Sequence, residues 1–176
     1  MVIDDPLVHL ASAGLLALLL GSGGMQKLRN LSNFMQVLQR YGLGQGSRRA
    51  LGFLLPVGEI LSAAGLLLSL EMPWLAVPAA VLLGAYAGVL AISVRRGEAI
   101  EDCGCHFGGK PQPTSPALVG RNLMLMGLAL NLSLPANVRP LVWFDALTLF
   151  FLFISAAALY GLAHLLMANH VALRKL

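Results

Sequence analysis

The sequence predicts an all-α protein, a polytopic bundle of transmembrane helices. Of its 176 residues, 57% are hydrophobic and only 11% are charged, and the mean hydropathy is +0.77. A soluble domain of this length has no core large enough to hide so much apolar surface. The apolar residues are also gathered into stretches of about 20 residues, which is the length that a helix needs to cross a bilayer.

Five apolar stretches qualify as membrane spans, and together they organise the chain as a single transmembrane domain, residues 1–176. The stretches are 7–24, 50–70, 74–94, 117–134 and 141–168. The first and fourth are short, so we expect four to five complete crossings. Asp4 and Asp5 precede the first stretch, where a secretory signal peptide would carry positive charge, so we interpret this stretch as a retained helix.

The segment 25–49 has a different pattern. Phe34, Leu38 and Tyr41 recur at helical spacing, and basic residues surround them. These basic residues are Lys27, Arg29, Arg40, Arg48 and Arg49. Apolar residues on one face and basic residues around them are typical of an amphipathic helix that lies in the membrane interface. We expect this segment to cap the bundle and to contact membrane lipid.

The only two cysteines form Cys103-Gly104-Cys105, in the polar connection 95–115 between two spans. Gly104 permits the bend that would bring the two cysteines within bonding distance, although the resulting ring is small and strained. Closing so short a loop stabilises a fold very little, whereas a strained and exposed disulfide exchanges readily. The motif therefore indicates a redox pair that cycles between dithiol and disulfide.

Glu59 lies deep within the second stretch, on the same helical face as Pro56, so we expect it to face protein rather than lipid. A buried ionised carboxyl group is costly unless it is paired. Arg121 enters the membrane from the same side, at a depth within side-chain reach. We predict a Glu59–Arg121 pair that handles protons or charge. Two other interpretations stay open: the pair is a purely structural salt bridge, or Glu59 is protonated and hydrogen-bonded to Asn122 or Asn131.

Several motifs occur in a fixed order between about Gly21 and Asn131. They are Gly24-Met25-Gln26-Lys27-Leu28, Phe34, Tyr41, Pro56-Val57-Gly58-Glu59, Cys103-Gly104-Cys105 and Arg121-Asn122. Together they resemble the methylamine-utilisation MauE family, which is related to the DoxX-like membrane proteins. One position differs, because His106 stands where the family pattern continues directly from the second cysteine to Phe-Gly.

The resemblance implies a protein of the bacterial inner membrane that is needed to mature the small (beta) subunit of methylamine dehydrogenase. The partners it implies are that periplasmic, disulfide-rich subunit and MauD, a thioredoxin-like protein. In this setting we expect Cys103 and Cys105 to exchange with a partner's thiols and to pass electrons to a membrane quinone. Glu59 or Arg121 would handle the protons. Whether the chain is itself an enzyme, a membrane thiol–disulfide oxidoreductase, stays open.

Two other functions are compatible with the same residues. Cys103, Cys105 and His106 could bind a soft metal ion such as Cu(I), since thiolates select it, whereas zinc would need ligands that this loop does not supply. Alternatively, the chain is a non-redox scaffold that recruits the thioredoxin-like partner. Nucleic-acid binding is not indicated, because the net charge of +4 comes from basic residues that flank the spans.

The basic residues are distributed unevenly between the two sides of the predicted bundle. If all five stretches cross, Arg139 is alone on one side, whereas the basic connections 25–49 and 95–115 share the other side. The positive-inside rule then places the Cys103 loop in the cytoplasm. In that orientation the chain would relay reducing equivalents across the membrane or bind its partner through the opposite face. Maturation of a periplasmic subunit would instead favour periplasmic cysteines, so the side stays open.

Overall fold

A computed structural model of the chain describes residues 5–41, 44–97, 116–135 and 139–173. Within these ranges every regular element is helical, and this confirms the predicted all-α class. The elements are α1 (Pro6–Arg29), α2 (Leu31–Arg40), α3 (Gln45–Leu67), the short 3-10 helix η2 (Pro73–Ala76), α4 (Val77–Arg96), α5 (Pro116–Leu132) and α6 (Trp143–Leu173).

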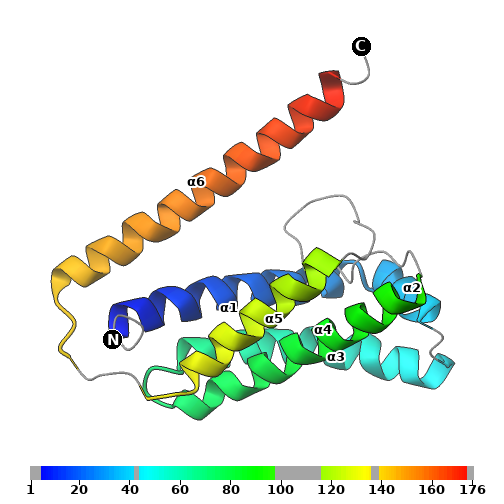
Figure 1. Ribbon diagram of the computed structural model, residues 1–176, viewed down its shortest axis with the longest axis horizontal. Helices are drawn as coiled ribbons and strands as arrows, with labels where there is room; N and C mark the ends of the chain where they lie inside the picture. Colours follow the sequence, from blue (N-terminus) through cyan, green and yellow to red (C-terminus); the bar gives the residue numbers. More distant parts are fainter. Residues whose placement is uncertain (1–4, 42–43, 98–115, 136–138, 174–176) are drawn as a thin grey trace.

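Four long helices, α1, α3, α4 and α5, lie side by side, while α6 runs away from them at an angle (Figure 1). Helix α1 packs mainly on α3, and α4 packs mainly on α5. Successive long helices run in opposite directions. One end of the bundle, beside α2, therefore contains the last residues of α1 and α4 and the first residues of α3 and α5.

Three helical segments in the described part of the chain are long and apolar enough to cross a membrane: Pro6–Arg29, Gln45–Leu67 and Pro73–Arg96. They match the first three predicted spans. Helix α5 is apolar but shorter, as is the part Trp143–Ala156 of α6. A helical membrane bundle is therefore confirmed.

The predicted amphipathic helix over residues 25–49 is wrong in its extent. Helix α1 continues to Arg29, the chain breaks at Asn30 with φ −119° and ψ 46°, and α3 already begins at Gln45. Only α2 is interfacial in character, since it buries Phe34 and Leu38 and exposes its polar side chains. The first span is longer than predicted because its buried face continues as far as Lys27.

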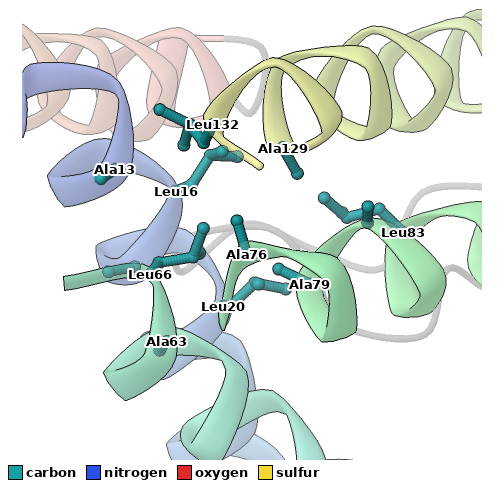
Figure 2. Packing of buried hydrophobic residues seen from close by; sticks show 12 residues of the cluster. Ala13, Leu16, Leu20, Ala63, Leu66, Ala76, Ala79, Leu83, Ala129 and Leu132 are labelled. Atoms are coloured by element: carbon teal, nitrogen blue, oxygen red, sulfur yellow. The ribbon is translucent and has the colours of Figure 1, made fainter. Parts of the chain in front are cut away.

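The apolar core lies where α1, α3, α4 and α5 converge (Figure 2). Leucines from all four helices interlock there, each less than 2% exposed: Leu16, Leu20, Leu66, Leu83 and Leu132. Alanines between them, such as Ala79 and Ala129, are fully buried and let the helix backbones approach closely. This packing fixes the helix neighbours that hold the polar residues described next.

Exposed arginines gather at the end of the bundle that carries α2, which we call the basic end. They are Arg29, Arg40, Arg49, Arg95 and Arg96. Gly97, in the left-handed conformation at φ 66°, terminates α4 at this end, and Pro116 is the first residue of α5 there. The connection 98–115 therefore leaves and rejoins the bundle at the basic end.

Candidate functional site

A buried polar cluster joins three helices of the bundle. Lys27 comes from α1, Glu59 from α3 and Tyr86 from α4, and their exposed fractions are 4%, 0% and 8%. Glu59 therefore faces protein, as its position on the Pro56 face predicts. A lysine and a glutamate buried inside membrane-spanning helices mark a candidate functional site, because such residues are costly to place there.

The close approach of α1 to α3 positions this cluster. A Cβ atom added at Gly24 would lie 2.8 Å from the carbonyl oxygen of Pro56 and 3.1 Å from Cβ of Glu59. Only glycine leaves room for the two backbones to touch at this point. Lys27 follows Gly24 by three residues on the same helix face, so its side chain extends alongside Glu59.

Glu59 accepts hydrogen bonds from both neighbours. The Lys27 ammonium group donates to Oε1 of Glu59 in a buried ion pair, and the Tyr86 hydroxyl donates to the same oxygen at 2.6 Å. Nζ of Lys27 lies 3.4 Å from the Tyr86 hydroxyl oxygen. The same nitrogen lies 4.9 Å from the ring centroid of Tyr86 and 5.6 Å from that of Phe34. Two aromatic rings thus face the ammonium group as well.

This arrangement brings a carboxylate, an ammonium group and a phenol together where little water competes with them. Opposite charges within hydrogen-bonding distance largely offset the cost of burying each charge, and aromatic faces stabilise the cation further. All three groups can hold or release a proton, and one oxygen of Glu59 is shared between two donors. The cluster can therefore retain a proton or pass one between its members without exposing a net charge to lipid.

The predicted Glu59–Arg121 pair does not form, because Glu59 takes Lys27 as its cation. The prediction considered only depth in the membrane, but α5 packs chiefly on α4, while α1 lies directly against α3. Arg121 is half-buried, and its Nε and Nη2 have no hydrogen-bond partner among the residues that the structure describes. Asn122, the alternative partner, donates to the carbonyl oxygen of Leu118 at 3.0 Å instead.

Lys27 and Tyr86 are the members of the cluster that sequence reasoning missed. The sequence pattern predicts Lys27 to be an interfacial basic residue, yet it continues the buried face of α1 that includes Ala13, Leu16 and Leu20. A signal was present, since extending that periodicity by two turns reaches Lys27. Tyr86 similarly lies on the buried face of α4.

Cys103, Cys105 and His106 lie outside the described residues, so the redox and soft-metal hypotheses stay predictions. Among the residues that the structure describes, no group of three or more His, Cys, Asp or Glu side chains could hold a metal ion. His9, buried at the far end of α1, has a hydroxyl partner instead, since its Nε2 lies 2.9 Å from Oγ of Ser69.

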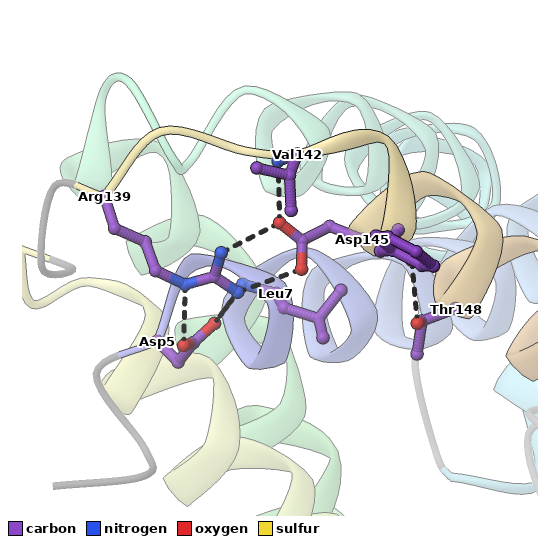
Figure 3. A network of polar contacts seen from close by, with 7 residues as sticks. Asp5, Leu7, Arg139, Val142, Asp145 and Thr148 are labelled. Carbon is purple, nitrogen blue, oxygen red and sulfur yellow. Dashed lines mark hydrogen bonds and ion pairs between the residues drawn. The ribbon is translucent and has the colours of Figure 1, made fainter.

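A second polar cluster lies at the end opposite the basic end, where Arg139 joins the starts of α1 and α6 (Figure 3). Its Nε and Nη2 donate to the two carboxylate oxygens of Asp5 at 2.9 and 3.1 Å, and Nη1 donates to Asp145 at 2.8 Å. Asp5 also caps α1 by accepting from the backbone N–H of Leu7. The hydrogen bonds from Arg139 hold the pKa of the Asp5 carboxyl below its usual value. This cluster ties helix ends together.

Comparison with known proteins places the chain in a family. The family model described as "Methylamine utilisation protein MauE" matches residues 5–135. Two proteins named methylamine utilization protein MauE are similar over most of their length: that of Paracoccus denitrificans is 38% identical over 96% of this chain and 95% of its own. That of Paracoccus versutus is 36% identical over 92% and 91%, respectively. No solved structure matches. The chain belongs to the MauE family, as the order of its motifs predicts.

Proposed function

We propose that this chain is an inner-membrane accessory protein of methylamine utilisation that helps to mature the small (beta) subunit of methylamine dehydrogenase. Membership of the MauE family supports a role in methylamine utilisation, since the similar Paracoccus proteins carry that name. The apolar helices support a membrane location. Maturation of a disulfide-rich subunit needs thiol chemistry, and this chain carries a cysteine pair suited to it.

The proposed chemistry is thiol–disulfide exchange at Cys103-Gly104-Cys105. A thiolate of a thioredoxin-like partner, MauD or another such protein on the same side of the membrane, attacks the Cys103–Cys105 disulfide, and a mixed disulfide forms. The partner's second thiol resolves it, so that the partner becomes oxidised and Cys103 and Cys105 become a dithiol. A membrane quinone then takes two electrons and two protons from the dithiol, which restores the disulfide and yields a quinol.

One structural observation supports placing this chemistry beside the buried cluster. Gly97 and Pro116, which flank the connection that carries the cysteines, lie at the basic end, and Lys27 of the cluster lies in the last turn of α1 at that same end. Proton transfer that accompanies quinone reduction would use Glu59 within this cluster. Arg121, near the start of α5, supplies positive charge on the same side.

The decisive experiment replaces both cysteines by serine in a host that assembles methylamine dehydrogenase. We expect the Cys103→Ser/Cys105→Ser variant to be inserted in the membrane at the normal level but to leave the dehydrogenase unassembled. Thiol trapping of the wild-type chain should find the pair oxidised without partner and reduced when partner dithiol is added. Full assembly by the double variant would exclude redox exchange and would favour the scaffold hypothesis.

His106→Ala serves as the matched variant that separates redox exchange from metal binding. The disulfide needs only Cys103 and Cys105, whereas a soft-metal site would use the imidazole as a third ligand. We expect His106→Ala to keep oxidising and reducing normally and to support assembly. Copper that copurifies with the wild-type chain and is lost in both His106→Ala and Cys103→Ser would contradict the redox proposal.

A further inference from the structure

Arg121 is a cation that lacks an anion among the residues that the structure describes. Its Nε and Nη2 are buried and donate to no acceptor there, and the residue as a whole is half-buried. The next residue, Asn122, is 2% exposed, and its Oδ1 also lacks a partner. Buried donors normally have an acceptor, so the two Arg121 nitrogens leave room for one, whereas Oδ1 of Asn122 would need a donor instead.

The same chain shows what such a guanidinium edge binds. Nε and Nη2 of Arg139 hold the two oxygens of Asp5 side by side, at 2.9 and 3.1 Å (Figure 3). Nε and Nη2 of Arg121 form the corresponding edge. This planar pair of donors matches the spacing of two oxygens on a carboxylate or a phosphate. The ligand that fits Arg121 is therefore an oxyanion.

The carboxylates of the described residues do not supply that oxyanion. Glu59 is engaged by Lys27 and Tyr86, and the others, Asp5, Glu71 and Asp145, belong to the opposite end of the bundle. Arg121 lies five residues after the start of α5, roughly 7–8 Å along the helix axis from the basic end. In a bilayer this depth lies near the boundary between headgroups and acyl chains, where phosphate groups are abundant.

We propose that Arg121 binds the phosphate group of an anionic phospholipid in the leaflet at the basic end. The exposed arginines around this end, such as Arg95 and Arg96, favour a lipid with net negative charge over a zwitterionic one. Binding requires the guanidinium to turn its Nε–Nη2 edge outward from its covered position, a side-chain movement that lets the charge reach the headgroup level. Lipid binding at Arg121 does not depend on disulfide exchange by Cys103 and Cys105, although the proposed thiol chemistry also uses the positive charge of this residue.

Native mass spectrometry of the full chain in detergent tests the proposal, with phosphatidylglycerol and phosphatidylcholine as probes. We expect the wild type to bind phosphatidylglycerol more tightly, and Arg121→Gln to weaken that binding roughly five- to tenfold. Arg121→Lys, which keeps the charge but loses the paired donors, should fall between them. Arg95→Gln is the matched comparison at the same end: it removes one exposed charge but no pair of buried donors, so we expect it to weaken binding of phosphatidylglycerol less than Arg121→Gln does.

Equal binding of phosphatidylglycerol by wild type and Arg121→Gln overturns the proposal. A wild-type protein that binds the two lipids equally well also overturns the proposal. This comparison needs no variant, so it is decisive even if Arg121→Gln fails to fold. Millimolar inorganic phosphate is added in a parallel series. We expect it to leave lipid binding unchanged, whereas displacement of the lipid would show a site for free phosphate instead.

Discussion

Lys27 and Glu59, which lie 32 residues apart in the sequence, form a buried ion pair that joins α1 to α3. Neither residue is exposed by more than 4%, and the pair sits beside the glycine contact that brings the two helices together. Each charge is tolerated because the other is present. The stability of the bundle and the chemistry of the cluster therefore depend on the same two side chains.

Removing one member of the pair should destabilise the protein more than removing both. Lys27→Met leaves the buried Glu59 carboxylate without the ammonium group, although the Tyr86 hydroxyl still donates to it. Breaking a buried ion pair in this way costs about 3–5 kcal/mol. The double variant Lys27→Met/Glu59→Leu removes both charges and should recover most of that loss. Thermal unfolding in detergent, followed by circular dichroism, measures the difference. A double variant less stable than Lys27→Met would contradict the expectation.

Tyr86→Phe should separate the hydrogen bond of Tyr86 from the contact of its ring. The phenylalanine keeps the aromatic face near Lys27 but loses the 2.6 Å hydrogen bond to Glu59. We expect a loss of about 1–3 kcal/mol, since the acceptor is charged. Tyr86→Leu also removes the cation–π contact and should lose more. Equal melting temperatures for wild type and Tyr86→Phe would show that the hydroxyl is dispensable for stability.

Gly24→Ala should disrupt the contact between α1 and α3. Its Cβ atom would lie 2.8 Å from a backbone oxygen of Pro56, which cannot move aside as a flexible side chain could. Gly88→Ala is the matched control within a helix, because nothing lies within 4 Å of its added Cβ. Alanine favours a helix over glycine by roughly 0.5–1 kcal/mol, so the control should be neutral or stabilising. Similar melting temperatures for the two variants would contradict this account of the packing.

Hydropathy was sufficient to predict the helical membrane bundle, because apolar stretches long enough to cross a bilayer have few alternative structures. It placed the first three spans within a few residues of the helices observed. It also placed Glu59 on a protein-facing side, since the small residues of α3 share that face. These properties depend on one helix at a time, and the sequence of one helix contains them.

The partner of Glu59 could not be found in the same way. Depth along the membrane normal made Arg121 a reasonable choice, but depth does not say which helices are neighbours. Lys27 near a helix end resembles an interfacial lysine, and only the packing of α1 on α3 turns it inward. Interactions between helices require the tertiary arrangement, and that is why the cluster differed from the prediction.

The link from Asp5 to Arg139 should respond to acid. Because hydrogen bonds from Arg139 lower the pKa of Asp5 in the folded state, the link stabilises the protein above the unfolded pKa and is lost as pH falls through the folded pKa. Asp5→Asn removes the charge but keeps a good N-cap for α1. The difference in melting temperature between wild type and Asp5→Asn should therefore be present at pH 7 and vanish well below about pH 4. A difference that does not change with pH would point to capping alone.

The concentration of arginines at the basic end predicts that this end faces the cytoplasm. A membrane-impermeant maleimide should then leave Cys103, in a Cys105→Ser background, unlabelled in intact cells and label it after permeabilisation. The matched control is Glu71→Cys without the native cysteines, because Glu71 is exposed at the opposite end and should react in intact cells.

The reverse labelling pattern would contradict the charge argument and would bring Cys103 and Cys105 within direct reach of a periplasmic thioredoxin-like protein. The predicted pattern has a different consequence. Cysteines in the cytoplasm cannot touch a periplasmic dithiol, so reducing equivalents would have to pass through the bundle, or the periplasmic partner would have to bind the opposite end. Surface substitutions there, at Glu71, would then weaken dehydrogenase assembly while leaving the oxidation state of Cys103 and Cys105 unchanged.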